Sequence, residues 1–241
     1  MTTAGLPGRG TEPLAGRTAV VTGSSRGIGA ATVRALSLAG ARVIGISRSA
    51  GDPVPNAITI QCDLLDPAAV TRAIVALERE LGGAPDILVN NAGVFAAKPV
   101  DETTSAAFSA MLALNLSVPF ELVRAFLPAM RARRRGHVVT VGSIADHQAL
   151  PGNAAYAASK FGARGLHEVL RTELAGTGVR ATLVSPAAVD TTLWDSVDPA
   201  ERSVFPPREA MLRPEDVADA ILFAVTRPER VAIGEIRLSK S

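Results

Sequence analysis

The sequence is poor in several residue types, and each shortage narrows the range of possible functions. Its 241 residues include one cysteine, Cys62, so no disulfide can form within the chain and a reducing compartment is expected. Aromatic residues make up only 4%, so aliphatic side chains must fill the core. The net charge of +2 is small, and we expect no nucleic-acid partner.

Long apolar runs and targeting signals are also lacking. We find no run of the length that spans a membrane and no signal-peptide pattern, so we expect a cytoplasmic protein without a membrane partner. Residues 1–14 are rich in Gly, Pro and Thr and predict a flexible tail. The histidines have no cluster of other ligand residues beside them, so we expect no metal site.

What the chain does contain is an alternation of short apolar runs and helical stretches from Gly16 onward. Strands are predicted at 18–22, 42–47, 57–62, 86–90, 137–142, 180–185 and 235–238. Helices are predicted from a glycine-rich turn to Ala39, and over 67–81, 105–133, 154–176 and 214–226. Continuous apolar strands separated by helices indicate a parallel sheet covered on both faces. We therefore predict an α/β fold with one doubly wound domain over 15–241, built on about seven parallel strands.

The stretch 187–213 breaks this alternation. It has little periodicity, contains the single tryptophan, Trp194, and follows the carboxyl end of a strand, where ligands bind in such sheets. We expect a substrate lid there rather than a passive loop, with Leu193, Trp194 and Phe205 among its apolar residues. His147 is a further candidate to face the substrate; the alternative is a solvated loop histidine.

A glycine-rich turn, Thr-Gly-Ser-Ser-Arg-Gly-Ile-Gly at 22–29, follows the first predicted strand and opens the first helix. Glycines let the backbone approach a pyrophosphate, and the helix N-terminus supplies amide donors and positive potential. Strand, turn and helix together predict a dinucleotide site. Its expected contacts are Gly23, Ser25, Arg26, Gly27, Ile28 and Gly29.

The end of the second predicted strand indicates which dinucleotide is bound. About twenty residues after the glycines, an NAD site usually places an acid against the ribose 2′-hydroxyl. This chain has Ser-Arg-Ser at 47–49, with no acid before Asp52. Arg48 and Arg26 can pair with a 2′-phosphate, which favours NADP(H) over NAD(H).

Two later strand ends supply further candidate cofactor contacts. Asp63, next to Leu64, is placed to accept a hydrogen bond from an adenine amino group; the alternative is an acid at the start of the following helix. Asn-Asn-Ala-Gly at 90–93 ends the fourth strand. Its small residues and amides suit a cofactor that passes close to Asn91, Ala92 and Gly93, although a plain turn would have the same composition.

The reacting groups are predicted from the only tyrosine, Tyr156, and one of only three lysines, Lys160. Positions i and i+4 share a helix face, so phenol and ammonium point into the same space. The ammonium and an oxidised nicotinamide would favour the phenolate, which makes Tyr156 a candidate general acid for ketone reduction and base for alcohol oxidation. Ser143 can hold the substrate oxygen. Asn115 lies in an apolar helix, so its side chain needs a hydrogen-bond partner from the backbone or from an ordered water. If Asn115 is functional, it anchors a chain of waters that returns protons to Lys160.

Together these residues resemble the short-chain dehydrogenase/reductase family, over nearly all of the chain after the tail. The motifs that carry the resemblance are the turn at 22–29, Asn-Asn-Ala-Gly at 90–93, Asn115, Ser143 and Tyr156-x-x-x-Lys160. The resemblance implies a Rossmann fold, an Asn-Ser-Tyr-Lys catalytic tetrad with Lys160 also holding the nicotinamide ribose, hydride transfer at a carbonyl or hydroxyl carbon, and usually a homotetramer.

One segment departs from the pattern of that family. Ala187 follows Pro186 where the family commonly has glycine, and its β-methyl limits the backbone there. Val189 and Thr191 still match the family positions that contact the nicotinamide carboxamide. We expect Ala187 to alter how the nicotinamide is shielded rather than to abolish activity.

Three functions remain open at this point. The first is an NADPH-dependent carbonyl reductase for a small or medium, largely apolar ketone. The second is a regulatory or scaffold protein that binds NADP without turnover. The third is a related epimerase or dehydratase that shares the Tyr/Lys pair, which the chain length and the glycine spacing disfavour.

Overall fold

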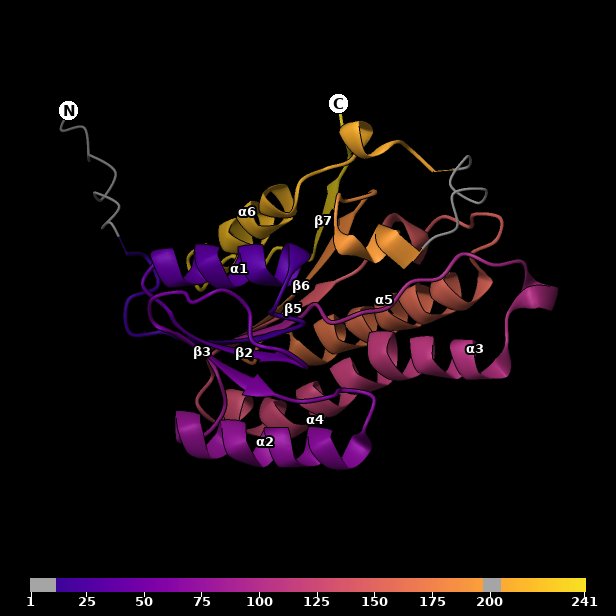
Figure 1. Ribbon diagram of the computed structural model, residues 1–241. Coiled ribbons are helices and arrows are strands. Elements are labelled where there is room, and N and C mark those ends of the chain that lie inside the picture. The colour runs from indigo at the N-terminus through magenta and orange to yellow at the C-terminus, as the bar shows by residue number, and fades with distance from the viewer. Residues whose placement is uncertain (1–11, 197–204) are drawn as a thin grey trace, which may run out of the picture.

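The computed structural model describes residues 12–196 and 205–241 and shows one parallel sheet between two layers of helices (Figure 1). The sheet has seven strands in the order β3-β2-β1-β4-β5-β6-β7. These strands are β1 (Thr18–Thr22), β2 (Arg42–Ser47), β3 (Ala57–Gln61), β4 (Ile87–Asn90), β5 (Gly136–Val141), β6 (Val179–Pro186) and β7 (Glu235–Leu238). The predicted α/β fold with a doubly wound sheet is confirmed, with strand ends shifted by a residue at most.

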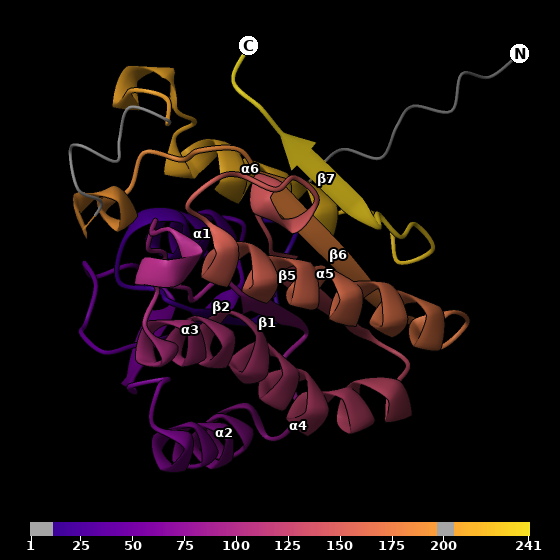
Figure 2. The ribbon, with the colours of Figure 1, turned by 90° about the vertical axis from the view of Figure 1, so that its right-hand side faces the viewer.

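Helices cover both faces of the sheet, as Figures 1 and 2 show. One face is covered by α1 (Gly27–Leu38) and α6 (Pro214–Val225), and the other by α2 (Pro67–Leu81), α4 (Val118–Ala132) and α5 (Ala154–Leu174). A shorter helix, α3 (Ser105–Leu112), packs on α5. Successive strand side chains point to opposite faces, so Val138 joins one core cluster while Val139 joins the other. This arrangement explains why the strands are continuously apolar.

The predicted helix 105–133 contains an interruption that the sequence pattern did not predict. A π-helical segment, Ala113–Ser117, separates α3 from α4 and has the buried Asn115 at its centre. By length and composition, the combined helix Ser105–Ala132 could cross a membrane, which corrects the expectation that no run reaches that length. In the fold, Leu122, Phe126 and Met130 are instead buried in the core beneath the sheet.

The ends of two predicted regions also differ from expectation. Residues 1–11 of the predicted tail 1–14 lie outside the described residues, whereas Leu14 is buried and its N–H donates to the Ala39 carbonyl. The packed fold therefore begins before residue 15. Within 187–213, two short 3-10 helices form, Thr192–Ser196 and Arg208–Ala210, and residues 197–204 are not described.

The sheet order creates a switch point between β1 and β4. The chain moves outward from β1 to β3, and then returns to place β4 on the other side of β1. Loops after adjacent strands on the two sides of such a point leave a crevice at the carboxyl edge of the sheet, where ligands bind in this class of fold. The glycine turn after β1 and the Asn-Asn-Ala-Gly segment after β4 both lie at this edge.

Candidate active site

The glycine turn after β1 has a shape that larger residues would prevent. Gly23 and Gly27 have φ of +68° and +56°, values that favour glycine. A Cβ at Gly29 would clash with the Gly23 carbonyl oxygen. At the start of α1, Arg26 is the N-cap residue and makes no side-chain capping bond, so the first amides of the helix are not occupied by a side chain. These amides are the donors that suit a pyrophosphate.

The segment after β4 braces this turn. The Asn91 side-chain amide donates to the Thr22 carbonyl at 2.8 Å, and the Asn91 and Ala92 backbone N–H groups donate to Thr22 Oγ1 at 3.0 and 2.9 Å. The residues at 90–93 therefore hold the glycine turn in place through hydrogen bonds to Thr22. Both polar atoms of the Asn90 side chain are buried and lack a partner within the described part of the chain.

The end of β2 lies beside the same turn. Ser24 Oγ donates to Ser47 Oγ at 3.2 Å, which joins the glycine turn to the segment that carries Arg48. Arg26 and Arg48 are both exposed, and neither forms a salt bridge with any residue of 12–196 or 205–241. Two unpaired guanidinium groups on adjoining loops suit a phosphate.

The two residues predicted to contact adenine after β3 differ in exposure. Asp63 is exposed at the end of β3, where its carboxylate accepts the Leu65 N–H at 3.0 Å. The helix N-cap is Asp66, which accepts the Ala68 N–H at 2.9 Å, so Asp63 does not cap α2. The Leu64 side chain is buried in the core, which leaves only its backbone for a cofactor.

Ser143, Tyr156 and Lys160 come together at the carboxyl end of β5. Lys160 Nζ donates to the Val141 carbonyl at 2.9 Å and lies 5.6 Å from the centre of the Tyr156 ring. The Ser143 side chain lies near enough to the Tyr156 phenol to act on its pKa. The i, i+4 placement on α5 thus brings phenol, hydroxyl and ammonium into one site beside the cofactor edge.

Burial shifts the pKa values of Tyr156 and Lys160 in opposite directions. It raises the pKa of Tyr156 to about 12, although the nearby Ser143 side chain acts to lower it and the Asp146 charge acts to raise it. It also lowers the pKa of Lys160 to about 8, against the raising effect of Asp146. The expected lowering of the Tyr156 pKa by Lys160 is not observed: the pKa is raised, and the main cause is the desolvation of the phenolate.

Asn115 is buried and fully engaged, as predicted for an amide in an apolar helix. Its Oδ1 accepts the Val94 N–H at 2.9 Å, and its Nδ2 donates to the Val94 carbonyl at 3.0 Å and to Ser159 Oγ at 2.9 Å. These bonds connect the segment after β4 to α5, three residues from Tyr156. Among the described residues, no hydrogen bond joins Asn115 to Lys160, and the water chain stays a proposal.

The loop after β6 contacts the glycine turn. A Cβ added at Gly27 would lie 3.2 Å from Thr191 Cγ2, so Thr191 sits against the turn. Val189 pairs with Leu212, and its carbonyl accepts the Trp194 Nε1–H at 2.9 Å. Ala187 extends the pairing of Pro186 by donating to the Leu238 carbonyl at 2.8 Å. Together with the open helix terminus and the orphaned Asn90 amide, these positions fit a dinucleotide.

Comparison with known proteins agrees with this geometry. The family model described as short chain dehydrogenase matches residues 17–202. An uncharacterized oxidoreductase of Staphylococcus haemolyticus is 34% identical over 92% of this chain and 96% of its own length. The chain belongs to the short-chain dehydrogenase/reductase family.

Two further relatives extend the comparison within this family. A metagenomic short-chain oxidoreductase, solved in complex with NADP, is 33% identical, covers 95% of this chain and 99% of its own, and superposes with a TM-score of 0.77. The glycine betaine reductase ATRR of Emericella nidulans is 35% identical over 93% of this chain. The match covers only 19% of that much longer protein.

A buried carboxylate, Asp146, is a feature of this family member that the sequence reasoning missed. Asp146 is 0% exposed, and its Oδ2 accepts the Ser143 N–H at 3.1 Å and the Ser185 hydroxyl at 2.5 Å. Its Oδ1 accepts from Arg164 at 3.2 Å and lies 2.7 Å from His147 Nδ1. With Ser143 it completes a capping box, and a Ser-x-x-Asp spacing was the available signal.

Phe95 was also missed, and it links Trp194 and Phe205 to the tyrosine of this short-chain dehydrogenase/reductase. Its ring packs edge-on against those of Tyr156, Trp194 and Phe205, with centres 4.9, 5.3 and 5.9 Å apart. Leu193 lies at the border of this cluster. His147 is partly buried and held by Asp146 rather than being simply solvated. The only available signal for Phe95 was its place shortly after a strand end at the site edge.

Proposed function

We propose that this protein is an NADP(H)-dependent oxidoreductase that interconverts a ketone and a secondary alcohol, with Tyr156 as general acid and base. The observation that carries the proposal is the meeting of Tyr156, Ser143 and Lys160 at the sheet edge that also holds the glycine turn. Membership of an oxidoreductase family and the NADP complex of a relative support the same reaction class.

The cofactor would be held by residues from five strand-end segments and from helix α5. We assign the pyrophosphate to the turn around Gly27, the 2′-phosphate to Arg26 and Arg48, and the nicotinamide ribose to Tyr156 and Lys160. The remaining proposed contacts are Gly23, Ser25, Ile28, Gly29, Asp63, the Leu64 backbone, Asn91, Ala92, Gly93, Pro186, Val189 and Thr191. When bound, NADP(H) supplies or accepts the hydride at the substrate carbon.

The chain's own residues handle the substrate oxygen and its proton. Ser143 donates a hydrogen bond to that oxygen, and Tyr156 gives it a proton in reduction or removes one in oxidation. A pKa of about 12 keeps the phenol protonated at neutral pH, which suits a general acid. Asn115 fixes the segment after β4 against α5, and Lys160 holds positive charge beside the tyrosine.

We propose that the substrate is a small or medium, largely apolar ketone. Phe95, Trp194 and Phe205 form an apolar wall next to Tyr156, and such walls bind apolar groups while a few polar atoms fix their orientation. The segment 187–213 then acts as the lid, with Leu193 and His147 at its margin.

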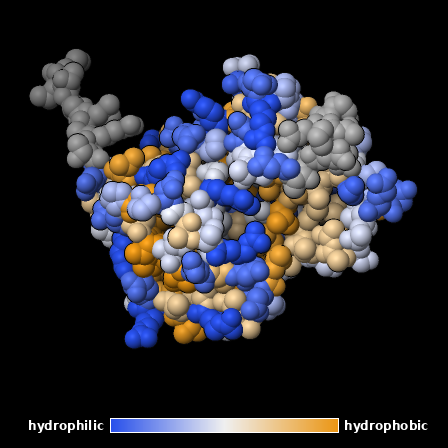
Figure 3. Space-filling view, viewed as in Figure 1, coloured by the Kyte–Doolittle hydropathy of each residue, from blue (hydrophilic) through white to orange (hydrophobic). Residues whose placement is uncertain are grey.

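We further propose a cytoplasmic homotetramer. Phe120 on α4 and Phe161 and Val169 on α5 are large apolar side chains that stand exposed. Figure 3 shows hydrophobic areas among charged ones on the visible face of the molecule. Light scattering behind a sizing column tests the assembly: a mass of four chains is expected, and a monomer at micromolar concentration would refute it.

The test of the reaction is a panel of ketones and alcohols, with NADPH or NADP⁺ and, in parallel, NADH or NAD⁺. Turnover of apolar ketones with NADPH is expected. Faster turnover with NADH would overturn the assignment of Arg26 and Arg48. Binding of NADP⁺ without turnover of any substrate would favour a regulatory protein instead.

A further inference from the structure

The few aromatic side chains of this protein are distributed unevenly. The chain has seven phenylalanines, one tryptophan and one tyrosine, all within the described residues. Only Phe126 is buried in the core between the sheet and its helices. Four others stand exposed on helices, namely Phe108, Phe120, Phe161 and Phe223. The remaining four gather at the active site, namely Phe95, Tyr156, Trp194 and Phe205. Aliphatic side chains fill the core elsewhere, so general packing does not account for four rings in one place.

Three of these rings form a wall beside the tyrosine, and we call Phe95, Trp194 and Phe205 the aromatic wall. The centre of the Phe95 ring lies 4.9 Å from that of Tyr156, with the two planes at 79°. The rings of Trp194 and Phe205 are 5.1 Å apart at 61°. Aromatic pairs prefer such edge-to-face arrangements at these distances. The Trp194 indole N–H donates to the Val189 carbonyl at 2.9 Å, so the backbone fixes the orientation of this ring.

The wall offers accessible ring surface, and charges of the adjoining segment compensate one another. Phe95 and Trp194 are each 8% exposed, whereas Phe205 and Tyr156 are only partly buried. Arg208 donates to Asp190 Oδ1 at 2.7 Å and also pairs with Asp195. These three charges interrupt the apolar residues of 187–213 in the sequence, but in the fold they bind each other. The surface next to the Tyr156 phenol is therefore aromatic.

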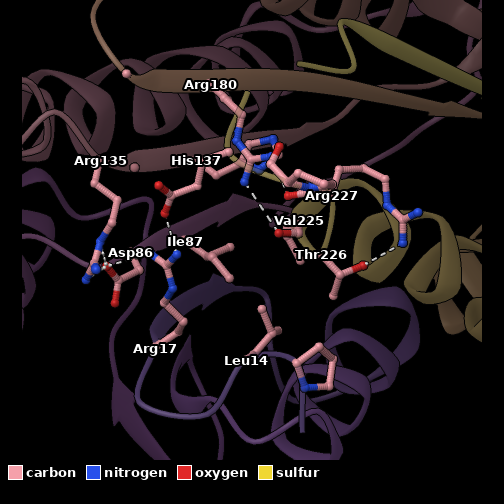
Figure 4. Close-up of a pocket in the computed structure, with 15 residues that line it drawn as sticks. Leu14, Arg17, Asp86, Ile87, Arg135, His137, Arg180, Val225, Thr226 and Arg227 are labelled. Carbon is pink, nitrogen blue, oxygen red and sulfur yellow. Dashed lines mark hydrogen bonds and ion pairs between the residues drawn. The ribbon is translucent and has the colours of Figure 1, made fainter. Parts of the chain in front are cut away.

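A cavity at the opposite edge of the sheet has a different lining. It lies where β4, β5 and β6 begin, and Arg17, Asp86 and Arg180 are among the charged groups around it (Figure 4). Placing an uncharged ring against charged groups removes water from them without giving a hydrogen bond in return, which is unfavourable. An aromatic ligand is therefore expected at the aromatic wall and not in this cavity.

We propose that the substrate is a ketone that carries an aromatic ring close to its carbonyl carbon, an inference that rests on the reaction proposed above. With the carbonyl oxygen held by Tyr156 and Ser143, a substituent of the carbonyl carbon lies beside the aromatic wall. The substrate ring packs edge-on against Phe205 and continues the arrangement of the wall. Each such ring pair strengthens binding about 2- to 12-fold beyond the effect of the buried area.

The test compares phenylacetone with cyclohexylacetone, which differ only in the ring. The cyclohexyl group has the larger apolar surface, so burial of area alone would favour cyclohexylacetone. The only tryptophan, Trp194, belongs to the aromatic wall, so its fluorescence reports binding directly. The full chain is titrated in the presence of NADP⁺, which cannot reduce a ketone. Phenylacetone should change the Trp194 emission in a saturable way, with a dissociation constant about tenfold lower than that of cyclohexylacetone.

Variants at one position locate the preference on the wall. Phe205→Leu removes the ring but keeps an apolar side chain, so the preference for phenylacetone should fall to about twofold or less. Phe205→Tyr keeps the ring and should keep the preference. Phe223→Leu is the control, because it makes the same change at an exposed position on α6. The comparison of the two ketones on the wild type needs no variant, so it stands even if Phe205→Leu fails to fold.

Four outcomes would overturn the inference. They are equal affinities for the two ketones, tighter binding of cyclohexylacetone, no response of the Trp194 emission to either ketone, and an unchanged preference in folded Phe205→Leu. Failure of the proposed reaction is distinguishable from these. Preferential binding of phenylacetone without NADPH consumption would refute the reaction and leave the aromatic site, whereas turnover of both ketones with equal affinities would refute only the aromatic preference.

Discussion

At the scale of single residues, Asp146 is a charge that acts on both proton-carrying groups of the site. It is buried between Ser143, His147 and Ser185, with Arg164 of α5 as its cationic partner. Its negative charge raises the pKa of Tyr156 and that of Lys160. A neutral side chain of the same shape would therefore move both titrations to lower pH.

This leads to a prediction for the pH profile of ketone reduction. The acid form of Tyr156 and the ammonium of Lys160 are both present below their pKa values, and the ammonium is lost first, at about pH 8. The value of kcat/KM should therefore be flat below pH 8 and fall above it. In Asp146→Asn the fall should begin at lower pH. Glu121→Gln, which removes an exposed partner of Arg124, is the control. Superimposable profiles of wild type and Asp146→Asn would show that Asp146 has no such influence.

Arg48 allows a second prediction at this scale. Removing its charge in Arg48→Gln should raise KM for NADPH about tenfold, because one charge-assisted contact to the 2′-phosphate is lost. KM for NADH should change little, since NADH has no such phosphate. Arg79→Gln, an exposed arginine on α2, is the control. An equal effect of Arg48→Gln on both cofactors would argue against a 2′-phosphate contact.

At the scale of elements, the glycine turn is the part whose shape depends most on residue size. Gly29→Ala introduces a methyl group that clashes with the Gly23 carbonyl, and overpacking of this kind costs about 1–3 kcal/mol. We expect a lower unfolding midpoint in urea and weaker NADP⁺ binding. Gly165→Ala in α5 is the matched control, because nothing lies within 4 Å of its added Cβ and alanine favours a helix. If both variants behave alike, the turn is not constrained as described.

Some helices, strands and turns could be predicted from the sequence, and others could not. The strands and the turn were predictable because β-branched runs end in glycine at sharp boundaries, as at Thr18–Thr22. The π-helical segment around Asn115 was not predictable. A helix that is apolar on nearly all sides has little periodicity, so one extra residue in a turn does not change its sequence pattern detectably. The contact of Phe95 with Tyr156 depends on tertiary packing between β4 and α5, which a single sequence does not encode locally.

At the scale of the whole molecule, the last strand is tied to the active site by ion pairs. Glu235 of β7 accepts two hydrogen bonds from Arg164 at 2.9 Å, and Arg164 also reaches Asp146. Arg164 and then Arg237 lower the pKa of Glu235 from its ordinary 4.5 to about 2. The edge of the sheet and the Ser143 turn thus share one charged network.

The sign of this shift predicts an acid-sensitive contribution to stability. A depressed pKa stabilises the fold at pH values above the ordinary 4.5, and this contribution is lost as pH falls toward about 2. Glu235→Gln should lower stability at pH 7 and show a shallower decline between pH 4.5 and 2 than the wild type. Urea unfolding at several pH values measures both. Parallel pH curves for the two proteins would mean that the ion pair does not contribute.

The central claim is that Tyr156 moves a proton during NADP(H)-dependent turnover, and its removal is the most direct test. Tyr156→Phe keeps the ring that packs on Phe95 and deletes only the hydroxyl. With the best ketone of the panel, we expect kcat for NADPH oxidation to fall by about 10²–10⁴-fold while the unfolding midpoint changes little. Wild-type turnover by folded Tyr156→Phe would contradict the proposed mechanism.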